Sequence, residues 1–239
     1  MGISVAAIDN LTDSAGGAED LPATIQSRRQ AAALIDPDTA WYRIGKRAMD
    51  LVGGLALLLA TLPATAVAAA LIKLTSKGPI LFRQERIGRG GRPFVMYKLR
   101  TMYQGAEDAR PVMERLNEKS KPIFKIRHDP RVTPVGRFLR RSSIDELPQL
   151  INVLRGEMSL VGPRPLWVKE ADEETGLALL RTAVKPGLTC LWQISGRSEL
   201  DYRTWVQLDV QYVLHRGLLL DVMILLQTIP VVLSEHGAY

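Results

Sequence analysis

Cysteine is almost absent from this sequence of 239 residues, which contains Cys190 alone. One cysteine excludes an internal disulfide framework and a cysteine-based zinc site. Histidine is also rare, and the three histidines are too widely spaced to predict a transition-metal site. A hard cation, held by carboxylates and phosphate oxygens, remains compatible with this composition. The three histidines are His128, His215 and His236.

Aromatic residues make up only 6% of the chain, whereas charged residues are frequent and mostly positive. Lys and Arg number 31 against 25 Asp and Glu, a formal net charge of +6. This excess suggests an anionic partner, which could be nucleic acid, anionic lipid or a phosphorylated metabolite. Because aromatic residues are not interleaved with the basic ones, we expect no nucleic acid partner.

The first 40 residues lack the apolar core of a secretory signal. Small residues, the pair Gly16-Gly17 and scattered acids predict a disordered tail over 1–40. We expect a membrane-embedded segment over 41–77 and a catalytic domain over 78–239.

Charge is missing from the 22 residues between Asp50 and Lys73. This run is long enough to cross a bilayer, but Pro63 near its middle favours a break in a helix. Each arm beside Pro63 has about ten residues, which at 1.5 Å per residue reaches about half of a ~30 Å hydrocarbon layer. Basic residues precede and follow the run: Arg43, Lys46 and Arg47, then Lys73, Lys77, Arg83, Arg86 and Arg89.

The basic flanks predict that both ends of the run face the cytoplasm, by the positive-inside rule. We therefore predict a re-entrant segment, a helical hairpin or broken helix with its kink at Pro63. An ordinary spanning helix and the buried core helix of a soluble protein are the alternatives.

The remainder predicts an α-rich α+β domain with a short β-hairpin. Residues 79–102 fit two strands around a glycine-rich turn at 88–91. Helices fit the segment that starts near Ser142 and residues 201–214. The apolar segment 218–233 is interrupted by Pro230 and is too short to cross a bilayer, so we expect an interfacial amphipathic helix.

Two adjacent acids, Asp145 and Glu146, stand out because arginines surround them in the sequence. A phosphate substrate accounts for both: arginines bind the anionic oxygens, and the carboxylates bind a metal or attack phosphorus. The structural alternative is helix capping, since capping-box spacing relates Ser142 to Asp145 and Ser143 to Glu146. The nearby arginines are Arg127, Arg131, Arg137, Arg140, Arg141 and Arg164.

Other polar residues could complete such a site. Arg141 lies one helical turn before Asp145 and could share a bound phosphate. Arg164 stands between two prolines, which would aim its guanidinium, although a solvated turn is an equal alternative. Lys98 and Arg100 alternate on a strand and could face phosphate or headgroups. Asp209 is either an acid behind the site or an exposed helix position.

The chain resembles the bacterial sugar transferase family, the monotopic polyprenyl-phosphate phosphoglycosyl transferases, from about Tyr42 to its C-terminus. The resemblance rests on the apolar segment with its central proline and on several motifs in one order. These motifs are Tyr97–Met102, Asp129–Thr133, Ser143–Leu150, Gly156–Pro165, Lys185–Thr189, Leu191–Gln193 and Ser195–Arg197.

This resemblance implies that a UDP-sugar and undecaprenyl phosphate react to give a lipid diphospho-sugar and UMP. It implies Asp145 as the nucleophile that carries a phosphosugar intermediate, and Glu146 as a ligand of Mg²⁺ or a proton acceptor. Arg141 and Arg164 would bind phosphate or uridine, and Lys98 and Arg100 would assist. The implied location is the cytoplasmic face of the bacterial inner membrane, in contact with its lipids, with a homo-oligomer left open.

The length of residues 103–124 and the Gly-Ala-Tyr end resemble relatives that transfer glucose or galactose phosphate for exopolysaccharide or capsule. The sequence departs from the family at Cys190, where glycine is usual, and at Leu62, where serine is usual. The rival hypothesis is a membrane-anchored basic scaffold without catalysis, for which Asp145 would be dispensable.

Overall fold

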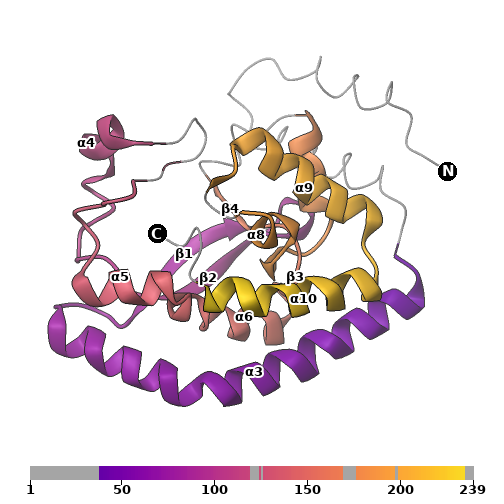
Figure 1. Ribbon diagram of the computed structural model, residues 1–239, viewed down its shortest axis with the longest axis horizontal. Helices are drawn as coiled ribbons and strands as arrows, with labels where there is room; N and C mark the ends of the chain where they lie inside the picture. The colour runs from indigo at the N-terminus through magenta and orange to yellow at the C-terminus, as the bar shows by residue number, and fades with distance from the viewer. Residues whose placement is uncertain (1–37, 119–123, 125, 169–175, 197–198, 235–239) are drawn as a thin grey trace.

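The computed structural model describes residues 38–118, 124, 126–168, 176–196 and 199–234. The long helix α3 (Ala40–Thr75) runs along one side, and the other described elements lie together on its concave side (Figure 1). The helices are α4 (Arg110–Met113), α5 (Pro134–Arg141), α6 (Gln149–Arg155), α8 (Leu191–Ile194), α9 (Tyr202–His215) and α10 (Leu218–Leu233). Short 3₁₀ helices are η1 (Arg89–Gly91), η2 (Glu114–Leu116), η3 (Ile144–Glu146) and η4 (Gly176–Ala183).

Two small sheets accompany the helices, so the predicted α-rich fold with a small β element is confirmed. Strands β1 (Leu81–Ile87) and β2 (Pro93–Leu99) form the predicted antiparallel hairpin, and β4 (Leu166–Trp167) pairs with the other edge of β1. The hairpin turn needs glycine, because position 90 has a φ of 66°. Strands β3 (Ser159–Val161) and β5 (Gly187–Thr189) form a separate parallel pair.

Helix α3 is continuous through Pro63, so the predicted hairpin or break at that residue is wrong. The proline removes only its own N–H from the helical ladder, while the hydroxyls of Thr61 and Thr65 donate to the carbonyls of Leu57 and Thr61, at 2.6 and 2.9 Å. The helix curves instead of breaking, with its convex side away from the body (Figure 1). Such bending is typical of a proline and of threonines that bond back to the helix.

Both ends of α3 are fixed to the same body. Near the N-terminal end, Asp50 is 1% exposed, and its Oδ1 accepts hydrogen bonds from Ser159 Oγ at 2.8 Å and Leu160 N at 2.9 Å. Near the C-terminal end, Ala68 and Ile72 pack in a buried cluster with Leu99 and Leu139. The helix therefore lies along the domain over most of its length.

The apolar stretch between these anchors faces outward. Only 11% of its most apolar window is buried, and by length and composition the helix could cross a membrane. This exposure contradicts the alternative of a buried core helix. Helix α10 also exposes an apolar face, with Leu219, Leu226 and Leu233 outside and Ile224 buried.

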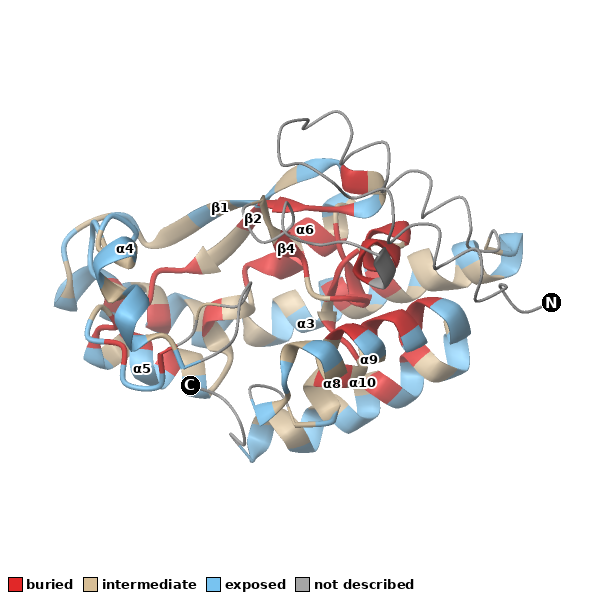
Figure 2. Ribbon diagram, turned by 90° about the horizontal axis from the view of Figure 1, so that it is seen from above, coloured by how far each residue is buried: buried red, intermediate tan, exposed pale blue. Residues whose placement is uncertain are grey.

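The main core lies between α6, β3, η4, α9 and α10, where buried residues concentrate (Figure 2). Its fully enclosed members include Leu150, Val153, Met158 and Val213. Cys190 belongs to this core and is fully buried, as expected for a small packed residue. Its φ of −159° is extended backbone, which accepts any side chain, so replacing the usual glycine does not distort this segment.

Replacing Asp50 tests the N-terminal anchor of α3. Asp50→Ala leaves the buried Leu160 N–H without an acceptor, which we expect to cost about 1–3 kcal/mol of stability. Asp50→Asn is the matched control, because both hydrogen bonds go to one oxygen, which the amide retains. Thermal unfolding in detergent measures the effect, and equal losses in both variants would contradict the anchor.

Candidate active site

A backbone turn at Ser142 and Ser143 places the two acids. Helix α5 ends at Arg141, Ser143 then adopts left-handed backbone with φ 58° and ψ 13°, and η3 carries Ile144 to Glu146. Helix α6 begins only at Gln149, so the prediction of a helix from Ser142 is wrong.

The alternative interpretation, in which Ser142 and Ser143 form capping boxes with Asp145 and Glu146, is also wrong. Ser143 makes no side-chain cap, and Ser142 Oγ donates back to the carbonyl of Phe138 at 3.0 Å. The dyad therefore does not serve as the first-turn acids of an α-helix.

Ser143 is the one residue other than glycine with positive φ in the described parts of the chain. A non-glycine residue in this conformation costs about 1–3 kcal/mol and persists only where surrounding contacts enforce it. The turn reverses the chain after α5 and directs Asp145 into the protein, where it is 7% exposed.

Asp145 is a buried carboxyl with mixed neighbours. Burial raises its pKa to about 6, the positive charges of Lys98 and Arg140 oppose this rise, and the charge of Glu146 adds to it. A carboxyl with this pKa is mostly ionised at neutral pH, yet most of its surface is shielded from water. Such an ionised and poorly solvated carboxylate has the chemical character that a nucleophile needs.

Glu146 faces a recess and pairs with Lys98. Lys98 Nζ lies 2.6 Å from Glu146 Oε1, and both side chains are partly exposed. The recess is narrow, with a volume of about 20 Å³, which is room for one water-sized group such as a phosphate oxygen. Its walls come from both strands of the hairpin, the start of α6, the segment after β3, β5 and α8: Arg86, Met96, Lys98, Glu146, Gln149, Arg164, Pro165, Gly187, Leu188, Trp192 and Gln193.

Arg164 lines the recess and is held by aromatic rings. Its guanidinium carbon lies 5.9 Å from the ring centre of Trp192 and 5.7 Å from that of Trp205. Such cation–π contacts limit the rotation of the guanidinium while leaving its N–H groups able to bind an anion. The structure thus places Arg164 in an aimed arrangement, unlike a solvated turn.

Asp209 lies one layer behind these rings. Its Oδ2 is 2.7 Å from Arg181 Nη2, and both side chains are almost completely buried. The Arg181 guanidinium in turn lies 5.6 Å from the ring of Trp205, the ring under Arg164. The alternative of an exposed helix position for Asp209 is therefore wrong.

Two other predicted site residues lie outside the recess. Arg141 is exposed at the end of α5, and the left-handed turn separates it from Asp145. Arg100 donates to the backbone carbonyls of Lys77 and Ser76, the latter at 2.9 Å, and so binds the C-terminal end of α3. The cation that acts on Asp145 from α5 is Arg140, whose Nε donates to Thr101 Oγ1 at 2.9 Å.

Sequence reasoning missed several residues that line the recess. Gln149 and Trp192 are 3% and 7% exposed, and their Nε2 and Nε1 groups have no hydrogen-bond acceptor within the described residues. Buried donors without acceptors usually mark a ligand or ordered water. Arg86 also reaches the recess, where Nη1 donates to the Pro165 carbonyl at 3.2 Å. A sequence pattern could have flagged only Gln149, which lies four residues after Asp145.

A metal site made by protein ligands alone is not found among the described residues, where no group of three or more His, Cys, Asp or Glu could hold an ion. The acidic dyad supplies two carboxylates. Mg²⁺ is commonly held by one or two carboxylates, waters and substrate phosphates, so the dyad fits such an ion when phosphate is bound.

Comparison with known proteins identifies the family of the chain. The family described as "Bacterial sugar transferase" matches residues 41–235. This chain belongs to that family.

Several relatives of this sugar transferase carry functional names. The UDP-glucose:undecaprenyl-phosphate glucose-1-phosphate transferase of Caulobacter vibrioides is 39% identical, over 96% of this chain and 86% of the relative. The exopolysaccharide production protein ExoY of Rhizobium meliloti is 40% identical, over 82% and 88%. The UDP-galactose-lipid carrier transferase of Erwinia amylovora is 41% identical over 82% of this chain, which spans only 42% of that longer protein.

The raised pKa of Asp145 predicts a stabilising effect of Asp145→Asn. With a pKa of about 6 in the folded state and 3.8 as the ordinary value, the folded protein binds more protons between these values. The free energy of unfolding of the wild type therefore decreases as pH rises through this window, by up to about 3 kcal/mol. Asp145→Asn has no carboxyl at this position and should not show the decrease. Melting temperatures between pH 4 and 8 should show a gain for the variant at pH 7.5 that disappears near pH 4.

Asp129→Asn is the control with the opposite sign. Burial raises the pKa of Asp129, but hydrogen bonds and charge from Arg131, 2.6 Å away, outweigh it and lower the pKa overall. This variant should lose stability at pH 7.5 and recover relative to wild type as pH falls below 4. A destabilised Asp145→Asn variant at pH 7.5 would contradict the assignment.

Proposed function

We propose that this sugar transferase moves a sugar-1-phosphate from a UDP-sugar to undecaprenyl phosphate as the first membrane step of exopolysaccharide or capsule assembly. The observation that carries the proposal is the buried, ionisable Asp145, which adjoins Glu146 at a recess that Lys98, Glu146 and Arg164 line. The Caulobacter vibrioides relative is named for transfer of glucose-1-phosphate from UDP-glucose to undecaprenyl phosphate, and the Erwinia amylovora relative for UDP-galactose and a lipid carrier. We propose one of these two sugars here.

In the first step, an Asp145 oxygen bonds to the sugar-bearing phosphorus, and the bond from that phosphorus to the bridging oxygen breaks. UMP leaves with this oxygen and its electron pair. In the second step, an oxygen of undecaprenyl phosphate attacks the same phosphorus and the bond to Asp145 breaks, which restores the carboxylate. Neither step requires an external oxidant or reductant, and covalent catalysis by a carboxylate is well precedented.

The residues in and behind the recess bind and orient the substrate phosphates. Lys98 and Arg164 neutralise phosphate charge, and the unmatched N–H groups of Gln149 and Trp192 donate to ligand oxygens. Asp145 and Glu146 would hold Mg²⁺, which supplies charge neutralisation for the diphosphate, although Glu146 as a proton acceptor is an equal assignment. Asp209 and Arg181 position Trp205, and through it Arg164.

The membrane placement follows from α3. The apolar stretch of α3 is exposed, yet both ends of the helix are fixed to the same body. If α3 crossed the membrane, this body would have to lie on both sides of the bilayer. We propose that α3 enters one leaflet and returns, with α10 lying beside it at the interface and the basic flanks against anionic lipid. By the positive-inside rule, the body lies on the cytoplasmic face of the inner membrane.

Transfer of label tests the proposal. The enzyme is incubated with UDP-glucose or UDP-galactose labelled in the sugar, undecaprenyl phosphate and Mg²⁺. We expect label in the lipid extract, equimolar UMP, and a loss of at least about 10³-fold in rate for Asp145→Asn, because the nucleophile is removed. Asp108→Asn removes an exposed carboxylate outside the recess and should retain wild-type rate.

A second measurement isolates the covalent step. Without the lipid acceptor, mass spectrometry should find a hexosyl phosphate on the peptide that contains Asp145. Turnover without that adduct would support direct displacement instead. Full activity of Asp145→Asn, or no transfer with any UDP-sugar, would favour the rival role of a basic scaffold.

A further inference from the structure

A second cleft, of about 210 Å³, opens at the N-terminal end of α3. Parts of α3, η1, β3, the segment before β5, and the end of α9 surround it. It shares no lining residue with the recess beside Glu146. The lining residues are Asp38, Tyr42, Arg43, Lys46, Arg47, Asp50, Arg89, Ser159, Val161, Val184, Lys185, Tyr212 and Arg216.

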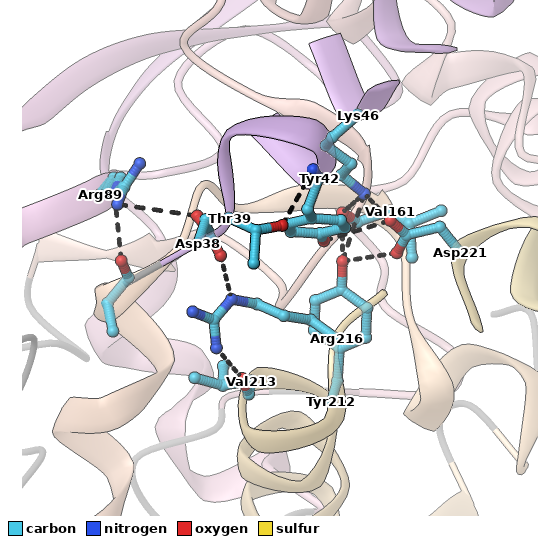
Figure 3. Close-up of polar contacts among 11 residues, drawn as sticks. Asp38, Thr39, Tyr42, Lys46, Arg89, Val161, Tyr212, Val213, Arg216 and Asp221 are labelled. Carbon is cyan, nitrogen blue, oxygen red and sulfur yellow. Dashed lines mark hydrogen bonds and ion pairs between the residues drawn. The ribbon is translucent and has the colours of Figure 1, made fainter. Parts of the chain in front are cut away.

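Positive charge predominates in this cleft, where six basic side chains meet two acidic ones. Some of this charge is already neutralised within the protein. Lys46 pairs with Asp221 at 2.9 Å, and Arg216 pairs with Asp38 at 2.6 Å (Figure 3). The carboxylate of Asp50 is occupied by its hydrogen bonds to β3.

Lys185 and Arg47 remain without a carboxylate partner among the described residues. Their terminal nitrogens converge, since a β-carbon at Gly156 would meet Lys185 Nζ at 3.5 Å and Arg47 Nη2 at 3.6 Å. Burial lowers the pKa of Lys185, and the charge of Arg47 lowers it further. Arg47 donates to the carbonyls of Val153 and Leu154, at 2.9 and 2.8 Å, which explains its own position.

The carbonyls at the end of α6 explain the position of Arg47, but they do not explain why Lys185 and Arg43 lie in the same cleft. No hydrogen-bond acceptor for Lys185 Nζ is found in the part of the chain that the structure describes. Arg43 also lines the cleft, and no ion pair or hydrogen bond of its side chain is found among those residues. Like charges brought together in a partly buried cleft repel one another, so an anion would stabilise the arrangement.

We propose that this cleft binds a phosphate group through Lys185, Arg47 and Arg43, at a site separate from the reacting phosphates. A membrane lipid headgroup is the favoured source, because α3 presents an exposed apolar face beside the cleft, which includes Ile44, Leu51 and Val52. A headgroup in the cleft would let acyl chains run along that face. The site does not depend on Asp145 acting as the nucleophile.

Lipid retention tests the site in the full-length protein. The protein is reconstituted in phosphatidylcholine nanodiscs with or without phosphatidylglycerol, and native mass spectrometry counts the retained lipids. We expect wild type to retain phosphatidylglycerol over phosphatidylcholine, and Lys185→Ala/Arg43→Ala to bind it at least about tenfold more weakly. Lys185→Arg preserves the charge and should retain the lipid.

Arg203→Ala is the matched control, because it removes an exposed cation on α9 outside the cleft. It should bind phosphatidylglycerol like wild type. Melting temperatures identify variants that fail to fold, and Lys185→Gln then replaces the double variant.

A calorimetric titration with inorganic phosphate, in phosphatidylcholine discs, distinguishes the two sources of phosphate. Binding of phosphatidylglycerol that depends on Lys185 supports a lipid site, whereas binding of inorganic phosphate alone, with the same dependence, supports a soluble anion. The proposal is overturned if neither binds, if the cleft variants bind as tightly as wild type, or if Arg203→Ala loses as much. Loss of transferase activity in Asp145→Asn with normal lipid retention separates this site from the catalytic one.

Discussion

The attachment of α3 at both of its ends to one body is the constraint on which the rest of the structure depends. Asp50 binds β3 at one end, and Ile72 packs with Leu99 and Leu139 at the other, while most of the apolar residues between them are exposed. The helix bends around the body because a proline and two threonines weaken its ladder without ending it. This arrangement holds the catalytic body beside any apolar phase that the helix enters.

The active site uses the same body but draws on a different kind of constraint. A left-handed turn at Ser143 turns Asp145 inward, where burial raises its pKa, and leaves Glu146 at the edge of the recess with Lys98. Opposing charges keep the buried carboxyl ionisable near neutral pH. The raised pKa thereby lowers stability at neutral pH at the position of the proposed nucleophile, and such a loss of stability is common where function requires it.

Sequence reasoning succeeded where local chemistry decides the outcome. The glycine-rich turn predicted the hairpin, and the length of the charge-free run between Asp50 and Lys73 identified α3 as a membrane candidate. Reasoning failed where tertiary contacts decide: a helix break was expected at Pro63, and a continuous helix at Ser143. That second error put Arg141 beside Asp145 in place of Arg140. Gln149, Trp192 and Arg86 come together only in the folded chain, so spacing alone could not link them.

The most direct test of the account is the sidedness of the two ends of α3. Single cysteines at Ala40 and Lys77, both exposed positions, are labelled with a membrane-impermeant maleimide, against a background in which Cys190 is fully buried. The account predicts that both positions are protected in intact bacterial cells and that both are labelled in inside-out membrane vesicles. Labelling of one end from outside the cell and of the other from inside would show that α3 crosses the bilayer, and would contradict it.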